Sequence, residues 1–369
     1  MEVFMVDRMT VSYQEKPCYD IVFSNDFNSL PSEIGEDKRG RKACIVTDSG
    51  AGPLYVPQVK GALEGVFSAC EVFSFPAGEE HKTLDTVQKL YAFLIGHRFD
   101  RKDVLIALGG GVVGDLTGFA AATYLRGIDF IQIPTTLLAQ VDSSIGGKTG
   151  VDFDAYKNMV GAFHMPSLVY INPDTLQTLE PRQFYNGFAE VMKHGLIRDS
   201  RYYEWLIKNM YEICARDPET LKRMIWRSCE IKREIVEKDP EERGERALLN
   251  FGHTIGHAIE KNSGFSLLHG ECVALGCVAA AYISWKKGRI EMEEYYEIRD
   301  MFVPFQLPIS ADDLDVDRIV ALTKSDKKMD GGHIRFVLLD GIGQAALDET
   351  VTDEEISSAV EELNFKEEG

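Results

Sequence analysis

The chain has 369 residues, of which 44% are hydrophobic and 27% are charged, and its net charge is −19. Because one hydrophobic core rarely supports a chain of this length, we expect two domains, with a ligand cleft between them. The acidic balance argues against non-specific binding to nucleic acid or to anionic membranes. An anionic substrate would therefore need a local basic pocket.

Neither secretion nor membrane spanning is predicted. The N-terminal segment has no basic stretch followed by an apolar one, and nowhere do 18 apolar residues run together. The expected location is therefore the cytoplasm. The seven cysteines include no CxxC pair, which argues against a disulfide framework and a thiolate zinc site.

The first part of the chain alternates short apolar strands with helical patterns. Strands are predicted at 43–48, 71–76, 103–109, 129–136 and 168–172, and a helix at 82–97. This alternation is typical of a parallel, doubly wound sheet. We therefore expect an α/β protein with an N-terminal Rossmann-like domain over 1–178.

From about residue 180 the pattern changes to long amphipathic segments of helical period. The predicted helices cover 201–214, 218–238, 246–262 and 270–287. Strand signals are few apart from 333–339, so an all-α domain is predicted over 179–369. The acidic C-terminal tail is expected to be a surface helix that frays.

A glycine-rich segment follows the predicted strand 103–109. Gly109, Gly111 and Gly114 fit the pattern G-x-G-x-x-G ahead of a helical stretch. Glycines let the backbone approach a pyrophosphate, and the helix N-terminus offers N–H groups and a positive dipole. The pattern is imperfect, because it follows the third predicted strand and lacks an acidic residue at the usual distance. A tight turn in an α/β sheet is the alternative.

Two further strand-end loops carry polar groups. In AGEEHK (77–82), Glu79 is placed to accept from a ribose hydroxyl and Lys82 lies near it, although a solvated surface loop explains this segment alone more simply. Thr135 and Thr136 end another strand. Three such loops on one sheet favour a nucleotide crevice.

The helical part holds candidate metal ligands. His253 and His257 are four residues apart and share a helix face, and His269 follows after a short loop. Two imidazoles and a carboxylate form the ligand set of a catalytic zinc site, although a His pair at this spacing is often structural. Glu190 and Lys193 share the face of an apolar helix, where a buried charge needs a partner or a metal; a surface ion pair is the alternative.

Basic side chains are spread between these two groups of residues. Asp142 and Lys148 flank a Ser/Gly-rich turn that, taken alone, is also compatible with a mere connector. The cations that could line a pocket for a phosphorylated substrate are Lys148, Lys193, Lys232, Arg246 and either Lys327 or Lys328.

Taken together, these segments resemble the 3-dehydroquinate synthase family of sugar-phosphate cyclases. The matching segments are AGEEHK, GGGVVGD, RGIDFIQIPTTLLAQVDSSIGGKTG, KNMVGAF, GFAEVMKHG, RALLNFGHTIGHAIE, HGE and DKK. The resemblance implies a homodimeric lyase of the shikimate pathway that uses NAD⁺ and a divalent metal, Zn²⁺ or Co²⁺. It implies conversion of 3-deoxy-D-arabino-heptulosonate 7-phosphate to 3-dehydroquinate and phosphate. The implied steps are transient oxidation, phosphate elimination, re-reduction and intramolecular aldol closure.

The resemblance also implies residue roles. It makes Glu190, His253 and His269 the metal ligands and places His257 beside the substrate. The residues implied to contact NAD are Asp48, Gly78, Glu79, Lys82, Gly111, Val112, Val113, Gly114, Asp115, Thr135, Thr136, Lys148, Lys157, Thr175, Leu176, Gln177 and Thr178. Those implied to serve the substrate are Asp142, Lys148, Asn158, Lys193, Lys232, Arg246, Asn250, His257, Lys327 and Lys328, with Arg126 reaching a neighbouring subunit.

Two positions depart from the family pattern, and three alternative functions remain. The family commonly has an Asp-x-Asn pair after the first strand; here Asp48 is retained, but Gly50 stands in place of the asparagine, which puts one adenosine contact in doubt. Asp152 stands where asparagine is usual and is interpreted as peripheral to the site.

The alternatives are another sugar-phosphate cyclase, a metal-dependent polyol dehydrogenase and an inactive binding protein. A carboxylate-bearing substrate is favoured by Lys157, Asn158, Lys232, Arg246 and Asn250.

Overall fold

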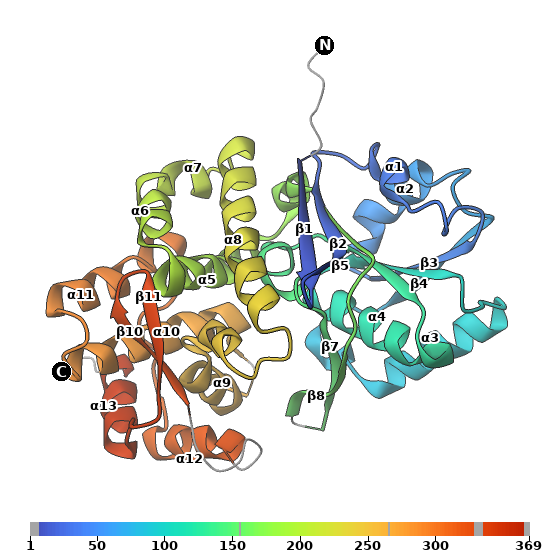
Figure 1. Cartoon of the computed structure of the whole chain (residues 1–369). Coiled ribbons are helices and arrows are strands. Elements are labelled where there is room, and N and C mark those ends of the chain that lie inside the picture. Colours follow the sequence, from blue (N-terminus) through green and yellow to red (C-terminus); the bar gives the residue numbers. More distant parts are fainter. Residues whose placement is uncertain (1–6, 155, 265, 328–334, 365–369) are drawn as a thin grey trace. The chain divides into compact units, whose positions relative to one another are not determined.

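The computed structural model describes residues 7–154, 156–264, 266–327 and 335–364, without the side chains of 325–327 (Figure 1). The chain forms two compact units. Unit 1 comprises Met1–Leu179 and Lys232–Glu241, and unit 2 comprises Glu180–Ile231 and Glu242–Gly369. The sequence placed the division one residue earlier and assigned 232–241 to the second domain. No helix in the described part of the chain is long and apolar enough to cross a membrane.

Unit 1 contains a seven-stranded sheet in the order β1-β2-β9-β6-β5-β3-β4. Neighbouring strands are parallel except for the β1–β2 pair. The strands are β1 (Asp7–Tyr13), β2 (Lys16–Phe23), β3 (Lys42–Asp48), β4 (Ala69–Phe75), β5 (Val104–Gly109), β6 (Asp129–Pro134) and β9 (Leu168–Ile171). The five strands predicted from the sequence are β3, β4, β5, β6 and β9, and the β1–β2 hairpin was not predicted.

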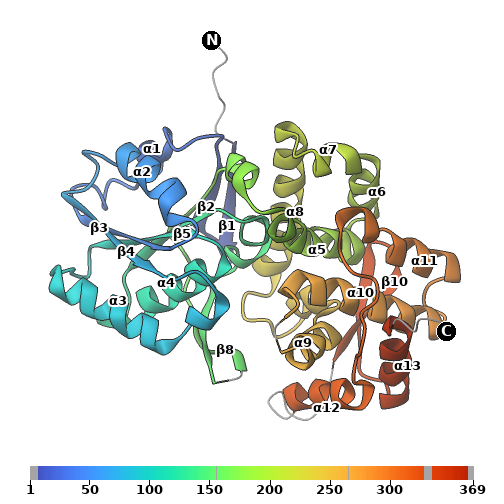
Figure 2. The same cartoon turned by 180° about the vertical axis from the view of Figure 1, so that it is seen from behind.

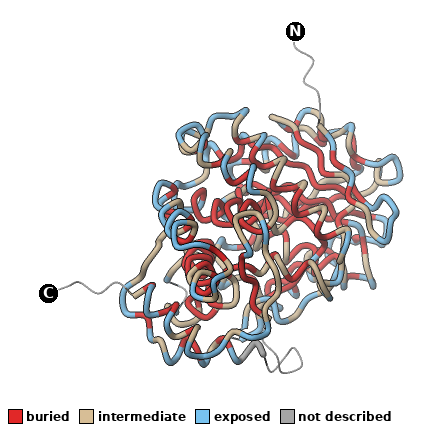
Figure 3. Tube along the Cα trace, turned by 60° about the vertical axis from the view of Figure 1, so that its left-hand side comes forward, coloured by how far each residue is buried: buried red, intermediate tan, exposed pale blue. Residues whose placement is uncertain are grey.

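Helices cover both faces of this sheet (Figures 1 and 2). The helices are α1 (Leu30–Glu33), α2 (Gly52–Ala62), α3 (Leu84–Gly96) and α4 (Gly111–Thr123). Ile45 and Ile106 pack with α1 and α2 on one face, whereas Val46 and Leu105 pack with α3 and α4 on the other. The strands β3, β5, β6 and β9 are therefore buried on both sides; Figure 3 colours the buried residues of the chain red.

The sheet has a topological switch point between β3 and β5. These strands are neighbours, yet the helix that follows β3 packs on one face and the helix that follows β5 packs on the other. At such a switch point, α/β sheets bind ligands at the carboxyl ends of the strands. A small antiparallel hairpin of β7 (Lys148–Phe153) and β8 (Tyr156–Phe163), not predicted from the sequence, packs beside α4.

The described residues of unit 2 form helices and one hairpin. Its helices are α5 (Pro181–Arg198), α6 (Ser200–Lys208), α7 (Met210–Cys214), α8 (Pro218–Lys238, the last residues of which belong to unit 1), α9 (His253–Asn262), α10 (His269–Lys286), α11 (Met292–Asp300), α12 (Val316–Lys327) and α13 (Asp353–Leu363). The predicted strand at 333–339 corresponds to β10 (Phe336–Gly341), which pairs with β11 (Gln344–Asp348); residues 333 and 334 lie outside the described residues.

Two predicted helices are interrupted. Segment 201–214 forms two helices, α6 and α7. They divide at Asn209, whose φ of −109° and ψ of 20° are not helical. Segment 246–262 forms a 3₁₀ turn, Glu245–Asn250, followed by α9. The break falls at Gly252, whose φ of 78° lies in the left-handed region that favours glycine.

Helices α9 and α10 approach each other closely because glycines line their contact. A Cβ atom at Gly276 would overlap the carbonyl group of Gly252, and one at Gly256 would lie 2.8 Å from the carbonyl oxygen of Cys272. Backbone therefore packs directly on backbone at this crossing. The close approach brings the first turn of α9, with His253 and His257, near the first residue of α10, His269.

Replacing Gly276 by alanine should therefore destabilise the protein. The added methyl group forces the two helices apart, and overpacking of this kind costs about 1–3 kcal/mol. Urea denaturation would measure the loss. Gly61→Ala is the control, because that helical position has open space around it and should gain up to about 1 kcal/mol. Equal stability of the two variants would contradict the packing described here.

Candidate functional site

The glycine turn predicted from the sequence begins α4. Gly111, Val112 and Val113 form the first helical turn, and no side chain caps it. A Cβ atom at Gly114 would lie 2.6 Å from Oε1 of Gln132 on β6, so a larger residue would require the Gln132 side chain to shift. The N–H groups of the turn thus lie at the carboxyl end of β5, where helix dipole and backbone donors favour a phosphate group.

Lys82 joins three segments around this turn. Its ammonium group lies 2.6 Å from Oδ2 of Asp115 on α4 and 2.5 Å from Oδ1 of Asn158 on β8. Glu79 lies 3.8 Å from the same ammonium group and 3.7 Å from the ammonium group of Lys157. Burial lowers the pKa of Lys82, but the charges of Asp115 and Glu79 outweigh burial and raise it. Lys82 is thus a buried, charged group that links the glycine turn of α4 to β8.

The predicted NAD contacts at Thr175–Thr178 lie in a 3₁₀ turn, Pro173–Thr178, after β9. The side-chain amide of the fully buried Gln140 donates to the carbonyl oxygens of Pro134 and Asn172 and to Oγ1 of Thr175. The hydroxyl of Tyr55 donates to the carbonyl oxygen of Thr175 at 3.0 Å and contacts Thr178. Sequence reasoning missed Gln140 and Tyr55, because their role depends on long-range contacts.

The two departures from the family pattern have local structural consequences. Oδ1 of Asp48 accepts from the backbone N–H groups of Gly50 and Ala51, both at 2.8 Å, so Asp48 closes the turn before α2. Oδ1 of Asp152 accepts from the backbone N–H of Asn158 at 2.8 Å. Asp152 therefore shapes the loop that presents Asn158 to Lys82, which is a closer involvement than the peripheral position expected from the sequence.

The remaining predicted residues of unit 1 lie in three places. Lys232 contacts the carboxylate of Asp142 at 2.7 Å and its backbone carbonyl. Lys148 is exposed at the start of β7, and Arg126 is exposed with a φ of 70°. The structure thus brings Asp142 together with Lys232, and Lys82 with Asn158, but places Arg126 in an exposed turn.

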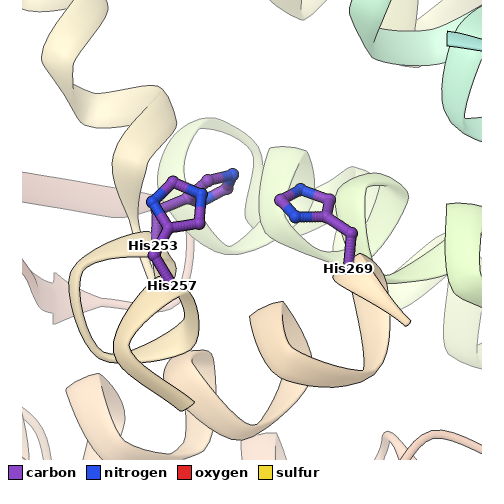
Figure 4. Close-up of side chains that lie close together, drawn as sticks. All are labelled: His253, His257 and His269. Carbon is purple, nitrogen blue, oxygen red and sulfur yellow. The ribbon is translucent and has the colours of Figure 1, made fainter. Parts of the chain in front are cut away.

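The candidate metal ligands lie together in unit 2. Three helices supply them: α5 carries Glu190, α9 carries His253 and His257, and α10 begins with His269. The three imidazole rings point toward a common space (Figure 4). One ligand atom of each histidine lies within 4.8 Å of the others. Oε1 of Glu190 lies 3.4 Å from Nε2 of His253 and 3.4 Å from Nε2 of His269.

These distances fit a metal ion. Ligand atoms about 2.0–2.1 Å from a tetrahedral zinc ion are about 3.3 Å from one another. Oε1 of Glu190 and the two Nε2 atoms match that spacing. His257 shares the same space, so His253 and His269 belong to both possible triads, one completed by Glu190 and the other by His257.

Glu190 is the electrostatic centre of this cluster. Its side chain is 1% exposed and forms an ion pair with Lys193, whose side chain is also 1% exposed. Burial raises the pKa of Glu190, but the charges of Lys193 and His253 outweigh it and hold the pKa well below its usual range. Glu190 is therefore an ionised carboxylate in the interior, and the surface ion pair considered from the sequence is excluded.

Contacts at the start of α10 fix His269 relative to Glu190. Asn186 lies one turn before Glu190 on α5, and its Oδ1 accepts from the backbone N–H of Gly270 at 2.5 Å. A Cβ atom at Gly270 would overlap the carbonyl group of Asn186. Glu271 accepts from the backbone N–H of Leu268 and forms two hydrogen bonds with Arg182. The HGE segment therefore anchors the helix end that carries His269.

The other predicted substrate residues of unit 2 lie on the turn before α9 or outside the described residues. Arg246 is 2% exposed, and Nδ2 of Asn250 donates to Glu242 at 3.0 Å. Lys327 ends α12, but its side chain is outside the described part of the chain. Lys328 lies entirely outside the described residues.

Comparisons with known proteins decide the family. Residues 72–186 match the family model described as 3-dehydroquinate synthase N-terminal, and residues 187–329 match 3-dehydroquinate synthase C-terminal. The chain is 44% identical to 3-dehydroquinate synthase of Acetivibrio thermocellus, covering 90% of this chain and 92% of the relative. It is 49% identical to the enzyme of Nitrosomonas europaea, with 85% of each chain covered. The chain belongs to the 3-dehydroquinate synthase family.

Solved structures place this family member among the cyclases. A 2-epi-5-epi-valiolone synthase from Streptomyces hygroscopicus, with NAD⁺ and Zn²⁺ bound, matches with a TM-score of 0.87 at 28% identity, covering 96% of this chain and 99% of the other. A 2-deoxy-scyllo-inosose synthase complexed with carbaglucose-6-phosphate, NAD⁺ and Co²⁺ matches with a TM-score of 0.88 at 27% identity and the same coverage. A butanol dehydrogenase from Thermotoga maritima, at 14% identity and a TM-score of 0.70, shares the fold alone.

In this family member, metal uptake should depend on pH. Burial lowers the pKa of His269, but the carboxylates of Glu190 and Glu260 outweigh it and raise the pKa to about 9. At neutral pH an incoming metal must displace that proton, so the apparent zinc affinity should rise by about tenfold per pH unit between about pH 6 and 8. Calorimetric titration of the metal-free protein in two buffers would measure the released proton. Zinc affinity that does not change with pH would contradict this assignment.

Proposed function

We propose that this protein converts 3-deoxy-D-arabino-heptulosonate 7-phosphate into 3-dehydroquinate and phosphate, as a carbon–oxygen lyase. The observation that carries the proposal is that both halves of the chain match the 3-dehydroquinate synthase models. The relatives that bear this name are 44% and 49% identical over most of the chain. The buried, charged cluster around Glu190 and the nucleotide-type turn at α4 supply the two kinds of site that the reaction requires.

Two cofactors serve this reaction. When bound, NAD⁺ accepts a hydride from the substrate and later returns it, while a divalent metal polarises the substrate hydroxyl. We assign NAD⁺ to unit 1, where the turn Gly111–Asp115 receives the pyrophosphate and Glu79 accepts from a ribose hydroxyl. We assign the metal, Zn²⁺ or Co²⁺, to Glu190, His253 and His269, because the distances from Oε1 of Glu190 to the two Nε2 atoms fit it.

The remaining residues position the substrate and move protons. Lys193 and Arg246 are buried cations of unit 2, and each can pair with a substrate carboxylate or phosphate. Lys232 and Asp142 offer a donor and an acceptor in unit 1. We place His257 beside the substrate, because its ring faces the space shared by the metal ligands and an imidazole transfers protons near neutral pH.

The competing functions have less support. The cyclases that make other products are 27% and 28% identical to this chain, well below the 3-dehydroquinate synthases. The dehydrogenase has the fold in common and no more. The substrate is thus a sugar phosphate, for which we propose a carboxylate-bearing one. The homodimer and the cytoplasmic location expected from the sequence stay predictions.

Phosphate release tests the proposed reaction directly. With 3-deoxy-D-arabino-heptulosonate 7-phosphate, Zn²⁺ and substoichiometric NAD⁺, we expect many equivalents of phosphate per NAD⁺ and no accumulation of NADH, because the hydride is returned in each cycle. Glucose 6-phosphate, which lacks a carboxylate, is the matched control and should release none. Absence of phosphate release, or NADH formed in proportion to product, would refute the proposal.

Metal content tests the ligand assignment separately. Glu190→Ala should abolish zinc binding, because it removes the only carboxylate assigned to the metal and leaves Lys193 buried without its partner. His257→Ala should retain zinc and lose proton transfer, so that phosphate release falls by about 10²–10⁴-fold. Elemental analysis of dialysed protein measures the zinc. The reverse result would assign His257 to the metal and remove Glu190 from its ligands.

A further inference from the structure

The imidazoles of His253 and His269 each have an oxygen atom on the side away from Glu190. His253 directs Nε2 toward Glu190, and its Nδ1 lies 3.1 Å from the backbone carbonyl oxygen of Phe251. His269 also directs Nε2 toward Glu190, and its Nδ1 lies 3.8 Å from Oε2 of Glu260. The two rings are thus oriented in the same way, one by a carbonyl group and the other by a carboxylate.

The position of Glu260 on α9 explains this arrangement. His253, His257 and Glu260 follow one another at spacings of four and three residues, so they share one face of the helix. Glu260 is only 3% exposed. A carboxylate in such a place costs free energy unless its charge is balanced. The imidazole of His269 is one group that can balance it, and the residue roles implied by the family resemblance do not include Glu260.

A neutral imidazole carries one proton, and the nitrogen that lacks it is the one that can bind a metal. For His269 to present the lone pair of Nε2 to the space beside Glu190, its proton must be on Nδ1. An acceptor beside Nδ1 favours that tautomer, orients the ring and makes Nε2 more basic. Glu271, two residues after His269, already binds Arg182 and the N–H of Leu268. Glu260 is therefore the carboxylate placed for this role.

We propose that Glu260 is a positioning residue of the metal centre, which accepts the Nδ1 proton of His269 and thereby holds Nε2 ready for the ion. The distance of 3.8 Å between Nδ1 of His269 and Oε2 of Glu260 is that of an electrostatic contact. This inference rests on the metal ligands proposed above. It predicts that Glu260 acts on metal affinity without touching the metal, the substrate or NAD.

The test compares zinc affinity in Glu260→Gln and Glu260→Ala with the full-length parent protein. The amide of Gln keeps the shape and an acceptor oxygen but loses the charge, so we expect zinc to bind about tenfold more weakly; alanine should cost up to about 100-fold. Competition with a chelator gives the dissociation constants. Glu293→Gln, an exposed carboxylate of α11, is the charge-matched control and should leave the affinity unchanged.

Two further measurements separate this role from a purely structural one. The visible spectrum of the Co²⁺-loaded protein should shift in both Glu260 variants, and thermal melting of the metal-free proteins reports on folding. If Glu260→Ala does not fold, Glu260→Gln decides, because a residue needed only for packing would tolerate the isosteric amide. Unchanged zinc affinity and an unchanged Co²⁺ spectrum in Glu260→Gln would overturn the proposal.

His269→Ala distinguishes failure of this inference from failure of the ligand assignment. If His269→Ala loses zinc while both Glu260 variants bind it as the parent does, the ligand assignment stands and the role of Glu260 is refuted. If His269→Ala binds zinc as tightly as the parent, the ligand assignment fails and the proposal for Glu260 fails with it. Graded weakening from parent to Gln to Ala, together with zinc loss in His269→Ala, supports both.

Discussion

A carboxylate held in the interior of unit 2 is the constraint on which the rest of the candidate metal centre depends. Glu190 stays ionised there because Lys193 and two histidines surround it. Charge of this kind is costly to bury, and it is retained where neighbouring charges or a metal compensate for it. Three helices must therefore meet at one point. The glycines between α9 and α10 and the contact between Asn186 and Gly270 are what allow them to do so.

Unit 1 meets a different requirement, because its proposed role is to present backbone donors to the pyrophosphate of NAD⁺. The carboxyl ends of β3 and β5 diverge at the switch point, and α4 begins there without a side-chain cap. Its surroundings are held by long-range polar contacts, with Lys82 joining α4 to β8 and Gln140 joining the ends of β6 and β9. Specific hydrogen bonds thus position loops whose own sequences would leave them free to move.

Periodicity and composition predicted the strands β3, β4, β5, β6 and β9, the helix α3 and most helices of unit 2, because most of those segments bury apolar faces. The hairpins β1–β2 and β7–β8 were missed, since β1 and β8 are mostly half-buried or exposed and therefore carry a weak apolar signal. The spacing of the histidines pointed to His253, His257 and His269 together, and only the family resemblance implied the ligand set Glu190, His253 and His269. The position of Glu260 behind His269 was not predicted. Helical spacing from His257 was the one available clue, and it becomes meaningful only once α10 is known to pack on that face.

The glycines at the α9–α10 crossing have a genetic consequence. A cluster assembled by backbone-to-backbone packing has no spare volume, so a methyl group at Gly276 or Gly256 displaces a helix that carries two of the imidazoles. A screen for variants that no longer retain a metal would then recover glycine substitutions that change no ionisable or metal-binding group, alongside changes to charged residues. Tolerance to mutation in this region is set by the steric room around the backbone as much as by the chemistry of the side chains.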